Sequence, residues 1–297
     1  MSFKNRVYGC AIIKAKNANY NADFTHQPRT LPDGTLYATD KVLKYSIRNY
    51  IKQFAQSEHV FFTKTFKEDL KVRDIKQRYE QLFSDDESDK KVVLKNLLDC
   101  IDVRLFGATY ASKKANISIH GPVQIEHGVN KFAPAESYSE QIMSPFSTSE
   151  GKSDASTLGS QAKVTEAHYV HSFSVNPYTL QTQYELAGDG HKELSENDIQ
   201  ILKDALCRGV TAYSSTAKAG TENECLLWIT LKEDSTKMVP SLTDLLSISD
   251  DGVIDLQKVS DLLEVISDDV DSVELYANTS FVQIDNIPEG VKVHPLS

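Results

Sequence analysis

The sequence contains little cysteine and no long apolar run. Its 297 residues include four cysteines, Cys10, Cys100, Cys207 and Cys225, and no two of them form a CxxC pair. Cysteines scattered in this way argue against a disulfide framework and against a zinc site, and they fit a reducing compartment. No apolar stretch approaches a membrane span, and the N-terminal MSFKNRVYGC lacks the apolar core of a signal peptide. We therefore expect a soluble, cytoplasmic protein that has no contact with a membrane.

An overall positive charge is also missing. The formal net charge is −10, which by itself argues against a nucleic-acid-binding protein. However, residues 1–131 carry 22 Lys and Arg against 15 Asp and Glu, whereas residues 132–297 carry 10 against 27. Phosphate binding depends on the local patch and not on the charge of the whole chain. The first part of the chain is therefore a candidate working surface, and the acidic remainder is a candidate outer or partner-facing surface.

Apolar periodicity predicts an α+β fold. Strands are predicted at 6–16 and in HVFFTKTF, ISIHGPVQIEHG, AKVTEAHYVHSFSVNP, CLLWITL and SVELYA, and helices at 41–55, 67–83, 90–101, 195–213 and 256–266. With insertions set aside, the order is β-α-β-β-α-β, which is typical of ferredoxin-like or RNA-recognition-motif folds.

The stretch ISIHGPVQIEHG places polar residues on one face of a predicted strand. Ser118, His120 and Gln124 alternate with isoleucine and valine, and Gly121-Pro122 interrupts the alternation. Proline cannot donate to a strand ladder, so we expect a bulge, a strand edge or the start of a new strand there. The polar face either meets water or lies beneath a ligand.

The predicted helix at 41–55 carries a basic stripe on a face separate from its buried stripe. The basic residues are Lys41, Lys44, Arg48 and Lys52, and the predicted buried residues are Leu43, Ile47, Tyr50, Ile51 and Phe54. A solvated surface is the plain interpretation of such a stripe. The helix begins just after a loop that contains Asn17, Asn19 and Asn21, and both helix N-termini and asparagine amides bind phosphate.

Four histidines fall in two pairs, His120 with His127 and His168 with His171. There is no HxxxH or HExxH motif, so the sequence predicts neither a metal site nor a cofactor. Histidine titrates near neutral pH, and an acid–base pair of the ribonuclease type is the catalytic alternative to a surface or core role.

A long polar insertion begins near Phe132. Ten of the 24 residues from Ser137 to Ser160 are serine or threonine. This composition fits a linker without regular structure. The insertion also contains Ile142, Met143 and Phe146, so the alternative is a projecting arm with an apolar tip that inserts between stacked bases.

Five stretches in order resemble the backbone subunit of type I CRISPR surveillance complexes (Cascade), a RAMP-superfamily protein, with the type I-B branch most similar. They are RVYGCAIIKAKNANYNADF, ATDKVLKYSIRNYI, DVRLFGATYA, ISIHGPVQIEHG and LSENDIQILKDAL, and they cover most of residues 6–215. The resemblance implies a single elaborated domain over residues 1–297 with an RNA-recognition-like palm. It further implies a finger loop at 17–39 and a thumb insertion at 132–163, and it leaves an acidic C-terminal extension at 233–297.

The resemblance also implies a function in antiviral defence. Such a subunit polymerises along CRISPR RNA (crRNA) as a helical filament without catalysis, and it presents the guide for base pairing with target DNA. The implied partners are crRNA, further copies of this chain, a repeat-handle-binding RAMP subunit, a large subunit and a crRNA-processing endonuclease. The implied RNA-binding residues are Asn17, Asn19, Asn21, Lys41, Lys44, Arg48, Arg104, His120, Gln124, Met143 and Phe146, with the last two as thumb wedges.

An enzymatic alternative stays open. Relatives in type III complexes cut target RNA with an aspartate in the loop after the first strand, and Asp23 of NADF lies in the corresponding loop. The second hypothesis is thus a metal-dependent RAMP endoribonuclease that cuts crRNA precursor or target RNA. Since the type I members are more similar, we expect Asp23 to be structural.

Overall fold

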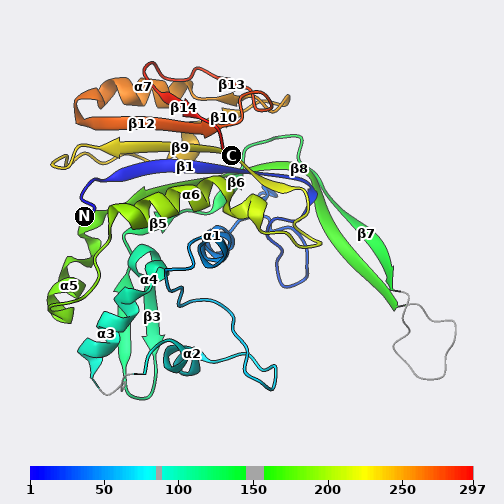
Figure 1. Ribbon diagram of the computed structural model, residues 1–297. Coiled ribbons are helices and arrows are strands. Elements are labelled where there is room, and N and C mark those ends of the chain that lie inside the picture. The colour runs from blue at the N-terminus through cyan, green and yellow to red at the C-terminus, as the bar shows by residue number, and fades with distance from the viewer. Residues whose placement is uncertain (85–88, 145–156, 297) are drawn as a thin grey trace, which may run out of the picture.

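A large, mostly antiparallel sheet forms the centre of the computed structural model, which describes residues 1–84, 89–144 and 157–296 (Figure 1). Its strands are β1 (Val7–Ala18), β2 (Tyr37–Ala38), β5 (Val123–Ile125), β6 (Gly128–Asn130), β7 (Ser137–Ser144), β8 (Thr157–Val175), β9 (Thr221–Leu231), β12 (Val270–Ala277) and β14 (Lys292–His294). They are arranged in the order β14-β12-β9-β1-β8-β6-β2, and β5 and β7 also pair with β8. The predicted α+β class is confirmed.

Two helices cover one face of this sheet, α1 (Asp40–Phe54) and α6 (Glu196–Ala212) (Figure 1). With the elements between them set aside as insertions, β1, α1, β5 with β6, β8, α6 and β9 occur along the chain in the predicted β-α-β-β-α-β order. The start of α6 agrees with the sequence: the Ser195 side chain accepts a hydrogen bond from the Asp198 backbone N–H in a capping box. Residues of β1 that alternate toward this face, such as Ala11 and Ile13, pack in the core with both helices.

The C-terminal segment covers the opposite face. It contains α7 (Gln257–Val265) and a small sheet of β10 (Ser247–Ile248), β11 (Ile254–Asp255) and β13 (Ile284–Asp285). Figure 1 shows these elements on the side of the main sheet away from α1 and α6. Cys10 and Ile12 of β1 pack with Leu256 and Val259 in a second apolar core. The acidic extension is therefore a folded layer of the domain.

A third apolar core lies beside α1. It is built from α2 (Ile75–Leu82), α3 (Lys90–Asp99), α4 (Ile101–Phe106), α5 (Gln181–Ala187) and a two-stranded sheet of β3 (Gly107–Ala111) and β4 (Asn116–His120). Phe61, Tyr79, Leu97 and Tyr110 are fully or nearly fully buried in it. This third core was not expected from the sequence.

Two predicted elements are wrong. HVFFTKTF is not a strand, because its backbone is bonded to side chains: the Phe61 and Phe62 N–H groups donate to Asp102, and the Val60 and Phe61 carbonyls accept from Arg78. The helix predicted at 67–83 is shortened to α2. The Asp74 capping box starts α2 late, and residues before it form a turn in which Leu70 has a φ of 61°.

The stretch ISIHGPVQIEHG is not one bulged strand: it contains β4 and β5 in two different sheets, and a new strand starts directly after Pro122, which was one of the alternatives for this proline. β4 pairs with β3, and β5 pairs with β8 of the main sheet. The chain changes sheet at Gly121-Pro122, where a Cβ on Gly121 would lie 2.1 Å from the Phe106 carbonyl carbon. Gly107, the strand partner of the adjacent His120, has a φ of 78°, which residues with a side chain rarely adopt. Glycine at both positions allows two backbones to touch.

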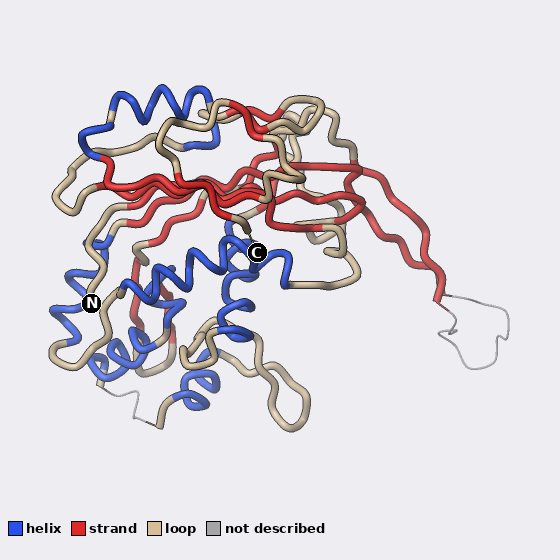
Figure 2. Tube along the Cα trace, turned by 45° about the horizontal axis from the view of Figure 1, so that its top comes forward, coloured by secondary structure: helices blue, strands red, loops and turns tan. Residues whose placement is uncertain are grey.

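The insertion is a β-hairpin and not a segment without regular structure. Ser137 to Ser144 pair in register with Val164 to Thr157. Figures 1 and 2 both show this hairpin projecting from the body of the domain. We call the paired residues 137–144 and 157–164 the arm. Residues 145–156, which include Phe146, lie outside the described residues.

All four cysteines are buried and free. Burial raises the pKa of the Cys10 and Cys207 thiols to about 12, and it also raises the thiol pKa of Cys100 and Cys225. In the described part of the chain, every helix is too short or too polar to cross a membrane.

Candidate nucleic-acid interface

The basic stripe lines a groove between α1 and the β3–β4 sheet. This basic groove has a volume of about 410 Å³. Its lining residues are Asp40, Lys41, Lys44, Arg48, Phe62, Phe106, Gly107, Ala108, Thr109 and Ile119. The stripe is therefore one wall of a concave surface, although Lys52 is not part of it.

Arg48 is held in this wall by a carboxylate that the stripe alone does not reveal. Its Nε donates to Asp102 Oδ2 at 2.8 Å, and its guanidinium carbon lies 5.6 Å from the Phe62 ring centroid and 5.1 Å from that of Phe106. The terminal nitrogens of Arg48 make no hydrogen bond to any described residue. The guanidinium is thus fixed on one edge and available on the other.

The two lysines differ in how they are held. Lys44 Nζ lies 3.0 Å from Asp40 Oδ2 and 5.5 Å from the Phe106 ring centroid, with a side chain 14% exposed. Lys41 is 84% exposed and 3.5 Å from the other oxygen of Asp40. Burial would raise the pKa of Asp40, but the hydrogen bond from Lys44 lowers it, so this carboxylate is ionised. Three cations therefore face two carboxylates, Asp40 and Asp102, and the wall has a small net positive charge.

The predicted polar face is divided by the change of sheet. Ser118 and His120 are exposed on β4, and their partners Thr109 and Gly107 across the hairpin line the basic groove. Gln124 lies in the main sheet, where its amide donates to the Gly121 carbonyl at 2.7 Å. His120 thus pairs with a residue that lines the groove, whereas Gln124 belongs to a different sheet.

Arg104 was expected at the same groove, and this expectation is wrong. It is 2% exposed, and its guanidinium donates to both oxygens of Asp198, to Glu58 and to the carbonyls of Leu98 and Asp99. With every edge of the guanidinium bonded inside the protein, Arg104 joins α4 to α6 and cannot reach a ligand on the surface.

The three asparagines have different roles. Asn19 is 5% exposed, and its amide donates to the carbonyls of Ala162 and His26, so it cannot serve as a surface donor as expected. Asn21 Oδ1 accepts from the Thr39 N–H and hydroxyl, which ties the loop to the start of α1. Asn17 is exposed, and its side-chain oxygen Oδ1 accepts a hydrogen bond from the Tyr138 hydroxyl on the arm.

His168 and His171 cannot act together, because they lie on opposite faces of β8. His168 lies between Glu224 at 2.6 Å and Glu166 at 3.2 Å. His171 is packed against Tyr20 in the core with α1. On the face of His168, Lys14 and Lys16 pair with Glu166 at 2.8 and 3.0 Å, and they lower the Glu166 pKa to about 2 although burial would raise it. This part of the sheet is internally neutralised.

Asp23 organises its own loop. Its Oδ1 accepts from the Thr25 N–H at 2.7 Å, the Thr25 hydroxyl at 2.7 Å and the Gln27 N–H at 3.0 Å. The hydrogen bond from the Thr25 side chain is the main reason that the pKa of this carboxyl is lowered. Among the described residues, no three His, Cys, Asp or Glu side chains converge as metal ligands.

The described end of the arm carries two exposed apolar side chains, Ile142 at 47% and Met143 at 71%. The arm is braced across its strands by Lys163 and Glu140, 2.5 Å apart. Met143 is therefore presented to solvent on a projecting hairpin, as the arm interpretation requires.

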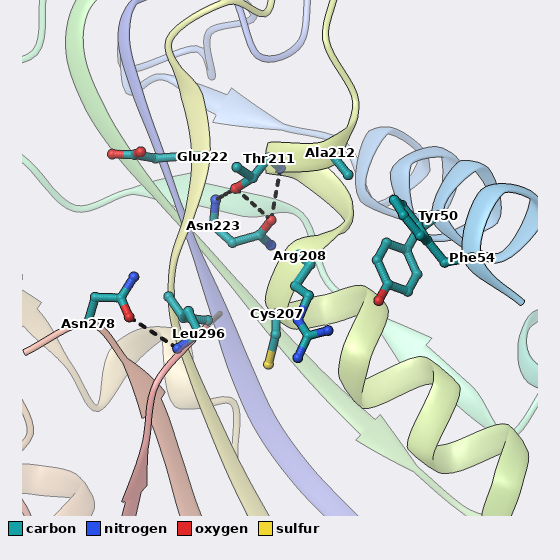
Figure 3. Close-up of a pocket in the computed structure, with 10 residues that line it drawn as sticks. All are labelled: Tyr50, Phe54, Cys207, Arg208, Thr211, Ala212, Glu222, Asn223, Asn278 and Leu296. Carbon is teal, nitrogen blue, oxygen red and sulfur yellow. Dashed lines mark hydrogen bonds between the residues drawn. The ribbon is translucent and has the colours of Figure 1, made fainter.

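A second pocket lies on the other side of α1, between α1, α6, β9 and the C-terminal end (Figure 3). It has a volume of about 430 Å³ and contains Tyr50, Phe54, Arg208 and Glu222. Figure 3 shows the Asn223 side chain turned toward Thr211, and its amide oxygen accepts hydrogen bonds from the Thr211 N–H and hydroxyl. Phe54 is 58% exposed here and not buried as predicted. One arginine and one glutamate give this pocket no excess charge for a phosphate chain.

Sequence reasoning missed the residues that shape the basic groove. Asp102, Phe62 and Phe106 come from segments that were predicted as a strand or as the approach to one. The alternation of charged and apolar residues in DVRLFG does not reveal which of its side chains is buried, and Phe62 comes from a different segment, HVFFTKTF.

Comparisons with known proteins agree with this fold. Residues 5–268 match the family described as CRISPR-associated protein Cas7. A chain of a "CRISPR RNA-guided surveillance complex" has a TM-score of 0.54 and 13% identity, with 95% of each chain covered. A chain of a "CRISPR RNA-guided surveillance complex, pre-nicking" has a TM-score of 0.56 and 10% identity, with 98% of this chain and 96% of that chain covered. At these identities the likeness shows the fold alone. No curated protein sequence matches.

Proposed function

Because this chain belongs to the Cas7 family of CRISPR-associated proteins, as the resemblance predicted, we propose that it is a backbone subunit of an RNA-guided surveillance complex. It binds crRNA, polymerises along it and leaves the bases of the guide free to pair with target DNA. The subunit acts without a catalytic step. The observation that carries this proposal is the basic groove, a concave surface that joins three cations to an exposed hairpin face.

The finer assignments are part of the same proposal. The β-α-β-β-α-β core is the palm, residues 17–39 are the finger loop, and residues 132–163 are the thumb. The hairpin form of the arm supports a thumb, because a paired ribbon can cross a gap to a neighbouring copy while a linker cannot. Residues 233–297 are the acidic extension, which lies as a layer on the palm. Met143 is the thumb wedge with a described position, and Phe146 is the other candidate.

The proposed RNA contacts are Lys41, Lys44, Arg48, His120, Asn17 and Asn21. Of these, the first three line the groove and His120 pairs with a residue that lines it. Gln124 is a contact only if the RNA crosses from the groove to the main sheet, because it lies in a different sheet from His120.

The remaining assignments follow from the resemblance. The complex is of type I and closest to the I-B branch. It works in the cytoplasm with a repeat-handle-binding RAMP subunit, a large subunit and a crRNA-processing endonuclease. The internal hydrogen bonds of Asp23 support a structural role for this residue.

The test is to incubate the purified chain with labelled crRNA, with and without Mg²⁺, and then to treat the complex with a nuclease. We expect protected fragments whose lengths increase by a constant step, with no difference between the two conditions. Cleavage of the RNA that requires Mg²⁺ would instead support the endoribonuclease alternative. Absence of binding would refute the backbone function.

A further inference from the structure

We propose that Asp102 is a positioning residue that holds Arg48 by its Nε, so that the two terminal nitrogens of Arg48 bind one phosphate oxyanion of the guide RNA. This inference rests on the proposed function and adds a specific site to it. No sequence feature marks Asp102, since the surrounding DVRLFG contributes a basic residue, Arg104, that is buried elsewhere.

Asp102 is suited to this role because it is completely buried and fully bonded. It is 0% exposed, and its Oδ1 accepts the Phe61 N–H at 2.7 Å. Its Oδ2 accepts the Phe62 N–H at 3.0 Å and the Arg48 Nε at 2.8 Å. The two backbone bonds fix the carboxylate, and the fixed carboxylate then fixes the plane of the guanidinium.

The aromatic rings complete the arrangement. The Arg48 guanidinium carbon lies within cation–π distance of both the Phe62 and the Phe106 ring. The Asp102 bonds to the Phe61 and Phe62 N–H groups also hold the Phe62 backbone, so one carboxylate positions both the arginine and a ring beside it. Arg48 therefore loses little rotamer freedom when it binds a ligand, and a guanidinium held in this way offers its planar fork to an oxyanion.

The terminal nitrogens are the part of Arg48 that remains for a ligand. They have no hydrogen-bond partner among the described residues, and Arg48 lines the basic groove with Lys41 and Lys44. A guanidinium that donates two parallel hydrogen bonds binds a phosphate more strongly and with a better-defined geometry than a lysine ammonium at the same place. The chemical class that fits is a phosphodiester oxyanion.

Positioning and simple charge attraction predict opposite effects when Asp102 loses its charge. If the groove binds RNA by charge alone, Asp102→Asn should tighten binding, because a negative charge disappears near the phosphates. If Asp102 positions Arg48, the same substitution should weaken binding, because the neutral amide has one accepting oxygen for three donors and its bond to Nε is no longer charge-assisted. We expect affinity for a single-stranded guide RNA to fall by about tenfold, as for the loss of a charge-assisted hydrogen bond.

Three comparisons make the experiment selective. Asp40→Asn removes a carboxylate from the same groove without touching Arg48, and it should tighten binding. Arg48→Lys keeps the positive charge, but its single ammonium cannot hydrogen-bond Asp102 and also donate two parallel hydrogen bonds to a phosphate. It should therefore weaken binding as strongly as Arg48→Gln. Glu274→Gln disrupts a half-buried ion pair with Lys203 that is not in the groove, and it should leave affinity unchanged.

The double variant Asp102→Asn/Arg48→Gln should bind no more weakly than Arg48→Gln alone, because both substitutions act on the same phosphate interaction. Equal or tighter RNA binding by Asp102→Asn would overturn the inference while the proposed function stands. If Asp102→Asn does not fold, wild-type affinity in Arg48→Lys would overturn it. If the wild-type chain binds no guide RNA, the proposed function and this inference fall together.

Discussion

Arg104 and Asp198 form a buried ion pair with two parallel hydrogen bonds that joins α4 to α6. Arg104 Nε donates to Asp198 Oδ2 at 3.0 Å, and Nη2 donates to Oδ1 at 2.7 Å. Asp198 is also the N3 residue of the α6 capping box, in which its side chain accepts the Ser195 N–H. Arg104, which was expected on the surface, thus connects the third core to a helix that covers the main sheet.

Replacing Arg104 by Met should therefore lower the stability of the fold, without a specific effect on RNA binding. Removing one partner of a buried pair leaves the other charge unpaired, which costs on the order of 3–5 kcal/mol. Chemical denaturation would measure the decrease in stability. The matched control is Lys4→Met, whose pair with Glu233 is exposed, and we expect no measurable change there. Native stability in Arg104→Met would contradict the assignment.

Changing Lys41, Lys44 and Arg48 together to Ala should weaken binding to guide RNA while the chain still folds, with a lower stability because the buried Asp102 loses its cation. For each phosphate that the variant no longer binds, the slope of log K against log salt should decrease by roughly 0.7 on a single strand. Because Asp40 and Asp102 partly neutralise these cations, the decrease in affinity should be smaller than for three unpaired charges. A salt titration of RNA binding measures the slope, and an unchanged slope would mean that the stripe is only a solvated face.

Replacing Asp23 by Ala should leave guide binding and assembly near normal. The carboxylate accepts hydrogen bonds only within residues 23–27, so its removal should loosen this loop and nothing beyond it. Binding and electron microscopy of the variant would check this expectation. If the wild type cuts RNA with Mg²⁺ and the variant does not, Asp23 is catalytic.

Deleting residues 139–160, or replacing Met143 and Phe146 by Gly, should spare the fold of the monomer but disrupt filaments. This part of the arm lies outside the apolar cores, so thermal stability should change little. Base stacking on side chains contributes on the order of 1–3 kcal/mol per base, and its repeated absence along the guide should shorten the assemblies. Electron microscopy on the same guide RNA would compare filament lengths, and filaments of normal length and regularity would show that the arm has no role in assembly.

Stability should rise with pH between about 4 and 6.5 because of His171. Burial lowers the pKa of His171 to about 4, whereas the unfolded value is about 6.5. Within this window the unfolded chain binds a proton that the folded chain does not, so stability is complete above the window and is lost as pH falls through it, by about 3 kcal/mol. Chemical denaturation at several pH values would follow the change. In His171→Leu this part of the pH dependence should disappear, and its persistence would assign the effect to another group.

The sequence predicted the elements whose apolar period is long and regular. The Ser195 cap and the spacing of Ile199, Leu202 and Leu206 identified α6 almost to the residue, and the central strands β1 and β9 followed from their apolar runs. These signals are local, so a single chain carries them.

The errors concern contacts between distant residues. Whether Arg104 or Arg48 meets solvent depends on Asp198 and Asp102, which periodicity does not locate. The residues Val60–Phe62 have strand composition, but their backbone partners are the side chains of Arg78 and Asp102. Only the α1 wall of the basic groove was predicted as its basic wall. The other wall, which includes β3, is formed where the chain changes sheet at Gly121.

The four buried cysteines make this protein convenient for distance measurements. A maleimide reacts with accessible thiolates, and all four thiols are shielded with raised pKa values, so the unmodified chain should give little background. A single cysteine introduced at exposed Ser139 would then carry a fluorophore alone. Energy transfer between labelled copies would report the spacing of arms along an assembly, copy by copy and in solution.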